Sequence, residues 1–323
     1  MMLYPFLFEA NLFPIVWGGN RLKKIKEMSE INEPIGESWE VSALAERESI
    51  VANGSLKGCN LRELVDQYGA SLLGEAVYKK YGKEFPLLVK FIDAETDLSI
   101  QVHPNDELAR ERHACMGKTE MWYIVDAMPG AYLYAGFSKE ISTEEYCQRI
   151  DDGSICDVLN KYEVKKGDVL YIPSGCVHSI CAGIFLVEVQ QSCDVTYRLF
   201  DYGRKDMNGE LRELHTDLAI DALSLSPTHN CFIPYDNNQN DVDLLCKCDY
   251  FTVRHLHFDS PQTYRVKEGD SFVIYVCING ECMVGDSILL EHGRSCLVPA
   301  SCKDINITVG DGEVELLEVF VSI

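Results

Sequence analysis

Positive charge is scarce in this sequence. Lysine and arginine together number 29, against 51 aspartate and glutamate residues, and the net charge is −22. A surface this acidic repels the phosphates of nucleic acids and anionic membranes. We therefore expect neither nucleic acid nor membrane as a partner. A phosphorylated substrate would require a local group of basic side chains.

Long apolar runs are also absent, and no stretch is long enough to span a bilayer. The first residues, MMLYPFLFEANLFP, have no basic start and an early Pro5, so they do not resemble a signal peptide. The fourteen cysteines are too scattered for a small disulfide scaffold, and the pair Cys246 and Cys248 has no second pair of matching spacing. These features predict a cytoplasmic protein with free thiols.

Short β-rich segments bounded by Gly, Pro and Asp dominate the chain, as in FPLLVKFI, EMWYIVDA, GDVLYIP and GIFLVEVQQ. This pattern is typical of an antiparallel barrel or sandwich. Helical patterns interrupt it at about 60–81, 142–152 and 216–223. The first two open on capping signals, Asn60 with Glu63 and Ser142 with Glu145.

Two short segments together predict a metal site. Side chains alternate along a strand, so Gln101 and His103 point the same way, and a carboxylate follows at Glu120. The run GDVLYIPSGCVH, from Gly167 to His178, has the spacing of the second cupin motif, in which a sharp turn aims an imidazole into a β-barrel. Two imidazoles, a carboxylate and an amide oxygen suit Zn²⁺ or a similar divalent ion.

The tail of the chain carries an altered copy of the same spacing. Gly293 and Pro299 repeat the first glycine and the proline, but Ser301 and Asp304 occupy the places of the second glycine and the histidine. A polar run at 235–241 precedes this region and is typical of a linker. We therefore predict a mainly β fold of two cupin-like jelly-roll β-barrels. Residues 1–235 would form a catalytic domain with the helical insertions, and 236–323 a metal-free β domain.

Five segments resemble the type I mannose-6-phosphate isomerases in their short bacterial form. They occur in order over the first two thirds of the chain, and the C-terminal region fits by architecture only. The segments are PIVWGG at 14–19, IGESWEVS at 35–42, FPLLVKFIDAETDLSIQVHPND at 85–106, KTEMWYI at 118–124 and VTYRLFDYGR at 195–204. The LSIQVHP run with KTEMWY downstream is the most specific part, whereas the Gly167–His178 motif alone would indicate only a cupin.

The resemblance implies an activity and a ligand set. The reaction would interconvert mannose 6-phosphate and fructose 6-phosphate through an enediol, with one zinc ion per chain held by Gln101, His103, Glu120 and His178. The partner would be a phosphorylated hexose, and the protein a monomer or a homodimer. One departure is Arg204, where the long eukaryotic forms carry lysine, which keeps the charge but changes its geometry.

Five further side chains are candidates for substrate contacts and proton transfer. In the family interpretation Glu188 faces the site and is our first choice for proton transfer, and Lys118 is the second. Arg198 would stabilise the developing oxyanion. Lys118 or Arg204 would hold the phosphate, and Ser99, on the same strand face as the proposed amide ligand, could add a hydroxyl.

Two other functions remain open from the residues alone. A cupin oxygenase would use iron and commonly a His-x-His pair, but Gln101 stands in the first place of that pair. A non-catalytic sugar-binding cupin would need no basic residues around the metal. His255 and His257 repeat the two-residue spacing in the tail, and we interpret them as part of a surface-facing strand because no carboxylate lies at a useful spacing.

Overall fold

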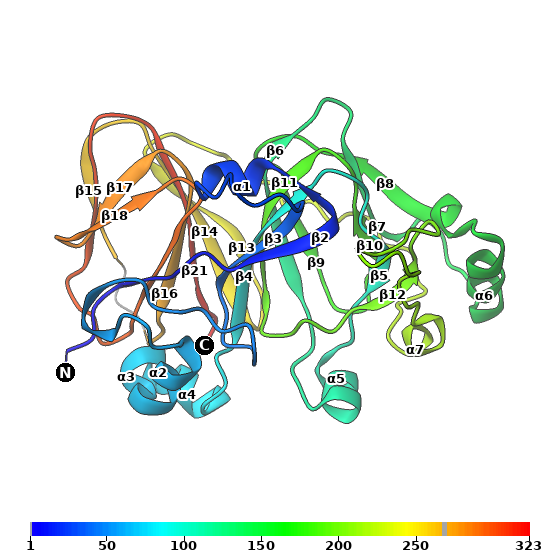
Figure 1. Ribbon diagram of the computed structural model, residues 1–323, viewed down its shortest axis with the longest axis horizontal. Coiled ribbons are helices and arrows are strands. Elements are labelled where there is room, and N and C mark those ends of the chain that lie inside the picture. Colours follow the sequence, from blue (N-terminus) through cyan, green and yellow to red (C-terminus); the bar gives the residue numbers. More distant parts are fainter. Residues whose placement is uncertain (1, 267–269) are drawn as a thin grey trace. The chain divides into compact units, whose positions relative to one another are not determined.

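The computed structural model describes residues 2–266 and 270–323, and most of its elements are β-strands (Figure 1). The chain forms two compact units, one of Met1–Asn11, Trp39–Val89 and Pro234–Ile323, and one of Leu12–Ser38 and Lys90–Ile233. This division has a boundary near residue 235, as in our prediction. It differs from the prediction because it groups 1–11 and 39–89 with the C-terminal segment. The assignment of 1–235 to one catalytic domain stays a prediction.

The unit of 12–38 and 90–233 is built on two antiparallel sheets. The six-stranded sheet has the order β2 (Leu12–Gly19), β3 (Ile35–Val41), β4 (Leu87–Ala94), β11 (Ile184–Gln191), β6 (Glu120–Ala127), β9 (Val169–Ile172). The five-stranded sheet has the order β12 (Tyr197–Phe200), β5 (Ile100–Val102), β10 (His178–Ile180), β7 (Tyr132–Phe137), β8 (Leu159–Glu163). Apolar side chains of both sheets, such as Trp122 and Leu186 from one and Leu133 and Ile180 from the other, form the core between them.

The unit that contains the tail also has two antiparallel sheets. One has the order β1 (Phe6–Leu7), β19 (Ser295–Val298), β16 (Val273–Asn279), β21 (Val314–Val321), β14 (Phe251–Phe258), β13 (Asp241–Lys247). The other has the order β15 (Gln262–Arg265), β20 (Asn306–Val309), β17 (Glu281–Val284), β18 (Ile288–Glu291). Their common core includes Leu256, Tyr275 and Leu316 from the first sheet and Leu290 and Ile307 from the second.

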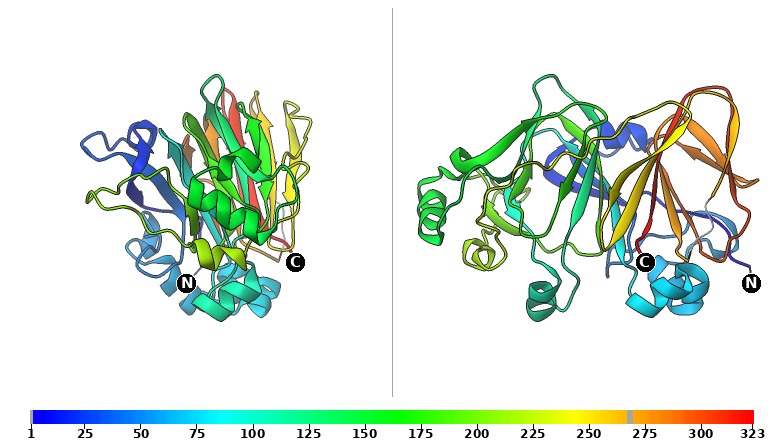
Figure 2. Two further views of the ribbon diagram at one scale, coloured as in Figure 1. Left: turned by 90° about the vertical axis from the view of Figure 1, so that its right-hand side faces the viewer. Right: turned by 180° about the vertical axis from the view of Figure 1, so that it is seen from behind.

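The prediction of a mainly β fold with helical insertions is therefore confirmed. Closure into barrels is not, because the strand pairings within 2–266 and 270–323 leave all four sheets open. The helices are short: α1 (Arg21–Ile25), α2 (Leu61–Tyr68), α3 (Ala70–Leu73), α4 (Glu75–Tyr81), α5 (Asp106–His113), α6 (Thr143–Asp152) and α7 (Thr216–Ile220). Two 3₁₀ turns add Gly54–Leu56 and Ile155–Val158. Figures 1 and 2 show α5, α6 and α7 on the outside of the sheets of their own unit.

The insertion expected at 60–81 is divided into three helices. Gly69 and Gly74 separate them, with φ angles of 44° and 97° that an L-residue with a side chain rarely adopts. The capping box is formed as predicted, because the Glu63 backbone N–H donates to Asn60 Oδ1 at 2.8 Å and the Asn60 N–H donates to Glu63 Oε2 at 3.1 Å. The helix expected at 216–223 ends earlier, at Ile220.

Candidate metal centre

The interior of the unit of 12–38 and 90–233 changes from apolar to polar along its strands. On β6, Trp122 belongs to the apolar core, and Glu120 is two residues before it on the same face. On β11, Leu186 belongs to the core, and Glu188 is two residues after it. Because these strands are antiparallel, with Glu188 opposite Trp122, the ionisable residues gather at one end of the interior.

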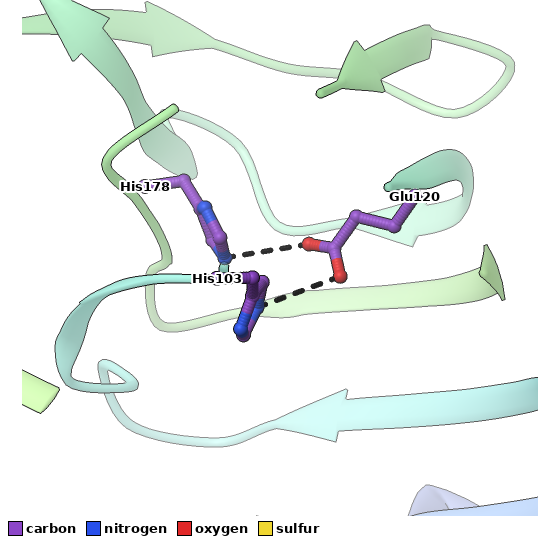
Figure 3. A group of neighbouring side chains, drawn as sticks. All are labelled: His103, Glu120 and His178. Atoms are coloured by element: carbon purple, nitrogen blue, oxygen red, sulfur yellow. Dashed lines mark ion pairs between the residues drawn. The ribbon is translucent and has the colours of Figure 1, made fainter. Parts of the chain in front are cut away.

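His103, Glu120 and His178 form a compact cluster at this end (Figure 3). The His178 Nε2 atom lies 3.3 Å from Glu120 Oε1, and His103 Nε2 lies 3.6 Å from Glu120 Oε2. All three side chains are at most 1% exposed. Within the described ranges it is the only group of three or more His, Cys, Asp or Glu residues whose ligand atoms all lie within 4.8 Å of one another.

The second nitrogen of each imidazole is held by a backbone carbonyl. His103 Nδ1 lies 2.9 Å from the oxygen of Val195, and His178 Nδ1 lies 2.8 Å from the oxygen of Cys176. When Nδ1 carries the proton and donates it to these carbonyls, Nε2 keeps a lone pair that points toward Glu120. The imidazoles are therefore oriented as metal ligands.

Burial keeps both imidazoles neutral. It lowers the pKa of His178 to about 4 and, with the Lys118 ammonium nearby, holds the pKa of His103 well below its usual range. A neutral imidazole is the form that binds a metal. His103 Nε2 and Glu120 Oε1 are buried without a hydrogen-bond donor or acceptor to pair with, as expected of atoms whose partner is an ion.

Gln101 lies beside the cluster. It is the register partner of His178 between β5 and β10, and its amide Nε2 lies 3.2 Å from His178 Nε2. Ser99, two residues earlier, places its hydroxyl 3.4 Å from Gln101 Oε1. Rotation of the terminal amide by 180° would present Oε1 to the same place, so the side chain can serve as an oxygen ligand.

A chain of alternating charges extends from Glu120 into the interior. Lys118 Nζ lies 3.0 Å from Glu120 Oε2 and 3.6 Å from Glu188 Oε1. Lys90 Nζ lies 3.5 Å from Glu188 Oε1 and 3.5 Å from Glu37 Oε2. Lys90 and Glu37 are site residues that sequence reasoning missed. The available signal was a lysine inside the apolar run FPLLVKFI, a position where a buried charge requires partners.

The buried charges set the protonation of this chain. Burial raises the pKa of Glu188, but Lys118, Lys90 and a hydrogen bond from Trp122 Nε1 at 3.1 Å outweigh burial and lower it below its usual value. Burial lowers the pKa of Lys118, but Glu120 and Glu188 more than offset this and raise it. At neutral pH the site therefore holds an ionised Glu188 beside a protonated Lys118.

The two arginines predicted from sequence lie on and after β12. Arg198 is the register partner of Gln101, which places it beside the cluster, and its Nη1 donates to the oxygen of Glu213 at 2.7 Å. Arg204 is farther along the chain and donates to Asp201 Oδ1 at 2.8 Å and to Thr96 Oγ1 at 3.3 Å. Apart from Arg204, the predicted site residues lie in or next to the cluster. Arg204 lies instead with Asp201 and Thr96.

Among the described residues, no such cluster includes the altered motif in the tail. Asp304 is 77% exposed and pairs with Arg265. The interpretation of His255 and His257 as surface-facing is wrong. Both are buried, and their Nε2 atoms lie 3.3 Å from Glu315 and 2.8 Å from Glu313. The carboxylates come from β21 and the loop before it, far away in sequence, so local spacing did not reveal them.

Two other expectations can be compared with the structure. All fourteen cysteines are free thiols, as predicted. No helix of the described residues is long and apolar enough to cross a membrane.

The chain is similar to one family over most of its length. Residues 7–126 match the family described as phosphomannose isomerase type I, catalytic domain, and residues 240–321 match the cupin domain of mannose-6-phosphate isomerase. A probable mannose-6-phosphate isomerase of Bacillus subtilis is 34% identical and covers 94% of this chain and 98% of its own. A mannose-6-phosphate isomerase of Streptococcus mutans is also 34% identical, over 98% of each.

Solved structures show the same likeness. The crystal structure of the mannose 6-phosphate isomerase of Bacillus subtilis has a TM-score of 0.87 and 31% identity, and covers 98% of this chain and 99% of that one. A zinc-bound mannose 6-phosphate isomerase has a TM-score of 0.79 at 16% identity, covering 99% of this chain and 100% of that one. At that identity the second likeness shows a shared fold.

Proposed function

The chain belongs to the type I phosphomannose isomerase family, and on this premise we propose that it is a zinc-dependent isomerase that interconverts D-mannose 6-phosphate and D-fructose 6-phosphate. The observation that supports this most strongly is the buried cluster of His103, Glu120 and His178 next to an ionised Glu188 and a protonated Lys118. A metal site joined to a proton-transfer pair can supply the Lewis acid and the base that an aldose–ketose isomerisation uses.

The donor set fits a zinc ion. His103, His178 and Glu120 supply two neutral imidazoles and a carboxylate, and Gln101 supplies an amide oxygen after rotation. Bound there, zinc would act as a Lewis acid toward the carbonyl and hydroxyl oxygens of the sugar. The carbonyls of Val195 and Cys176 would hold the imidazoles in place during turnover.

Proton transfer is assigned to Glu188. An ionised carboxylate can remove the proton from the carbon next to the carbonyl, which gives an enediol intermediate. Return of the proton to the neighbouring carbon then gives the other sugar. Trp122 donates to Glu188 Oε2, so Oε1, which faces Lys118 and Lys90, is the oxygen left to carry the proton. Lys118, with its raised pKa, stays protonated and is better suited to orient and stabilise than to act as the base.

The remaining candidates are assigned by their neighbours. Arg198, beside Gln101 in the sheet register, supplies a fixed positive charge near the developing oxyanion. Ser99 supports Gln101 by donating to its Oε1 atom. Lys118 is already paired with two carboxylates, which favours Arg204 as the residue that holds the phosphate.

The finer architecture belongs to the same proposal. The tail domain from 236 onward would bind no metal, because Asp304 stands where a ligand histidine is needed. We further propose that both domains are jelly-roll barrels of the cupin kind, that residues 1–235 carry the catalysis, and that the protein acts in the cytoplasm as a monomer or a homodimer.

A coupled isomerase assay combined with metal analysis tests the function. Purified protein should contain about one zinc per chain and convert mannose 6-phosphate, and chelation should abolish turnover. Glu188→Gln should keep its zinc but lose roughly 10²- to 10⁴-fold in kcat, the range of general acid–base catalysis. Glu144→Gln, at an exposed position in the first turn of α6, is the matched control and should be as active as the wild type.

Two outcomes would support the alternatives. Stoichiometric iron together with oxygen uptake would favour a cupin oxygenase and overturn the proposal. Binding of the sugar phosphate without any turnover, in protein that holds its zinc, would favour a non-catalytic sugar-binding protein.

A further inference from the structure

A second group of cations lies just after β12, in the same unit as the metal centre. Asp201 is 4% exposed, and its Oδ1 accepts from Arg204 Nη2 at 2.8 Å and from Arg212 Nη1 at 3.4 Å. Arg198, on β12 itself, is close enough to interact electrostatically with Arg204 and Arg212. Two guanidinium groups therefore contact one carboxylate, and a third lies near them. Arg212 has no part in the function proposed so far.

The positive charge of this group is not balanced by its own members. Burial and the neighbouring arginines lower the pKa of Arg198, and burial, with a contribution from Arg204, lowers that of Arg212. In a chain with a net charge of −22, like charges held together in partly buried positions require a reason. The Nε atoms of Arg198 and Arg204 are also buried without a hydrogen-bond partner, so donors for an anion remain unused.

Nearby acids are engaged elsewhere. Glu37 lies 3.5 Å from Lys90. Asp206 accepts from the backbone N–H groups of Asn208 at 2.8 Å and Glu210 at 3.0 Å. The Glu213 carboxylate is 82% exposed. Asp201 thus orients the arginines, and a bound anion would balance the positive charge that remains.

Arg212 is connected to the metal centre through the residues that follow it. The oxygen of Glu213 accepts from Arg198 Nη1 at 2.7 Å, and the His215 backbone N–H donates to the oxygen of Arg198 at 2.7 Å. Arg198 is in turn the register partner of Gln101. Arg212 therefore stands at the start of a short segment that is hydrogen-bonded to β12 at the position next to Gln101.

We propose that Arg212, together with Arg204, binds the phosphate of the substrate and sets the preference for phosphorylated over free sugar; this inference rests on the proposed function. A phosphate monoester carries about 1.5 to 2 negative charges at neutral pH, which matches the excess of this group. Guanidinium groups bind phosphate through two parallel N–H bonds, which lysine cannot form. The Oδ1 atom of Asp201 holds the guanidinium groups of Arg204 and Arg212 in position.

Steady-state kinetics with two substrates test the inference. Arg212→Ala should lower kcat/KM for mannose 6-phosphate roughly 10- to 100-fold, as expected for the loss of a charge-assisted pair, and should change kcat/KM for free mannose much less. The inhibition constant of inorganic phosphate should rise by a similar factor. The kcat/KM of Arg212→Lys for mannose 6-phosphate should lie between those of the wild type and the alanine variant, because lysine keeps the charge but lacks the planar guanidinium group.

Controls separate this role from a structural one. Arg149→Ala removes an arginine of α6 that pairs with Glu145 and should behave as the wild type. If Arg212→Ala reduces activity equally for both substrates, its role is to support Arg198, and the inference is overturned. If the alanine variant does not fold, an unchanged ratio of the two substrates in Arg212→Lys overturns it as well.

Direct binding keeps the inference distinct from the proposed function. Calorimetry with inorganic phosphate on wild type and Arg212→Lys measures the anion site without turnover. Wild-type protein that lacks isomerase activity but binds phosphate through Arg212 would refute the proposed function alone. Isomerase activity with unchanged phosphate binding in the variant would refute only the assignment of Arg212.

Discussion

Replacing His178 with alanine should remove the stabilisation that zinc gives to the fold, whereas Asp304→Ala should keep it. The His178 side chain is 1% exposed and its Nε2 lies 3.3 Å from Glu120, so the substitution deletes one of two imidazoles from the cluster. Asp304 stands at the matching place of the tail motif, is 77% exposed and pairs only with Arg265 among the ion pairs of the described residues. The two variants therefore contrast the same motif position in the two units.

The size of the effect follows from binding to the folded state alone. At a free zinc concentration about 1,000 times Kd, the folded state gains ~4 kcal/mol. Unfolding entropy of about 2.1 cal/mol/K per residue corresponds to about 0.7 kcal/mol/K for 323 residues, so this gain raises Tm by about 6 °C. If the loss of an imidazole weakens binding about 1,000-fold, the same zinc concentration adds only ~0.4 kcal/mol, less than about 1 °C.

Thermal unfolding followed by circular dichroism is the assay. Each variant is first stripped with a chelator and then measured with and without zinc, so its own metal-free Tm is the reference and any cavity left by the lost imidazole cancels. Wild type and Asp304→Ala should show the shift, and His178→Ala should not. A Tm shift in His178→Ala equal to that of the wild type would place the metal elsewhere. Loss of the Tm shift in Asp304→Ala would refute the proposal that the tail motif binds no metal.

Four further outcomes are expected. Arg198→Ala should depress kcat strongly with a modest change in KM, the pattern of an interaction made mainly in the transition state; a raised KM with intact kcat would move this residue to the phosphate. Arg204→Ala should raise KM for the phosphorylated sugar far more than for free mannose, measured in the same coupled assay. In metal-free protein the two buried imidazoles should make the free energy of unfolding, from urea titrations, fall as pH drops from about 6.5 toward 4. The folded-state pKa of His178 is about 4 and that of His103 is also lowered, so the unfolded chain binds the extra protons; His178→Gln should weaken this dependence and leave the part due to His103. Asn60→Ala should lower the unfolding free energy by ~1 kcal/mol through the lost cap of α2 and leave kcat/KM unchanged, because Asn60 is not one of the residues of the candidate site; a lower kcat/KM in fully folded protein would contradict this.

The candidate metal ligands could be identified from the sequence because the features that mark them are local. Gln101 and His103 share a strand face by alternation, and the glycine and proline of the Gly167–His178 run mark the turn that aims an imidazole inward. The capping box of Asn60 and Glu63 is local for the same reason, since three residues span one helical turn. Each of these features depends on atoms a few residues apart.

Features made by distant segments could not be predicted in this way. Asp270 accepts from the first backbone N–H groups of α4, from Glu75 at 2.7 Å and Ala76 at 2.9 Å, across almost two hundred residues. His255 has the same spacing from His257 as Gln101 has from His103, yet its partner is a carboxylate of β21 that only sheet register brings near.

The sequence by itself determined which side chains can bind a metal, because residue type and strand period decide chemistry and direction. Only the tertiary structure decided which charges meet. The antiparallel register of β6 and β11 sets Glu188 beside Lys118, and the packing of β4 and β3 adds Lys90 and Glu37. Pairing between strands fixes distances of a few ångströms between residues far apart in the chain, and at those distances, in a dry interior, electrostatic interactions are strong enough to set protonation.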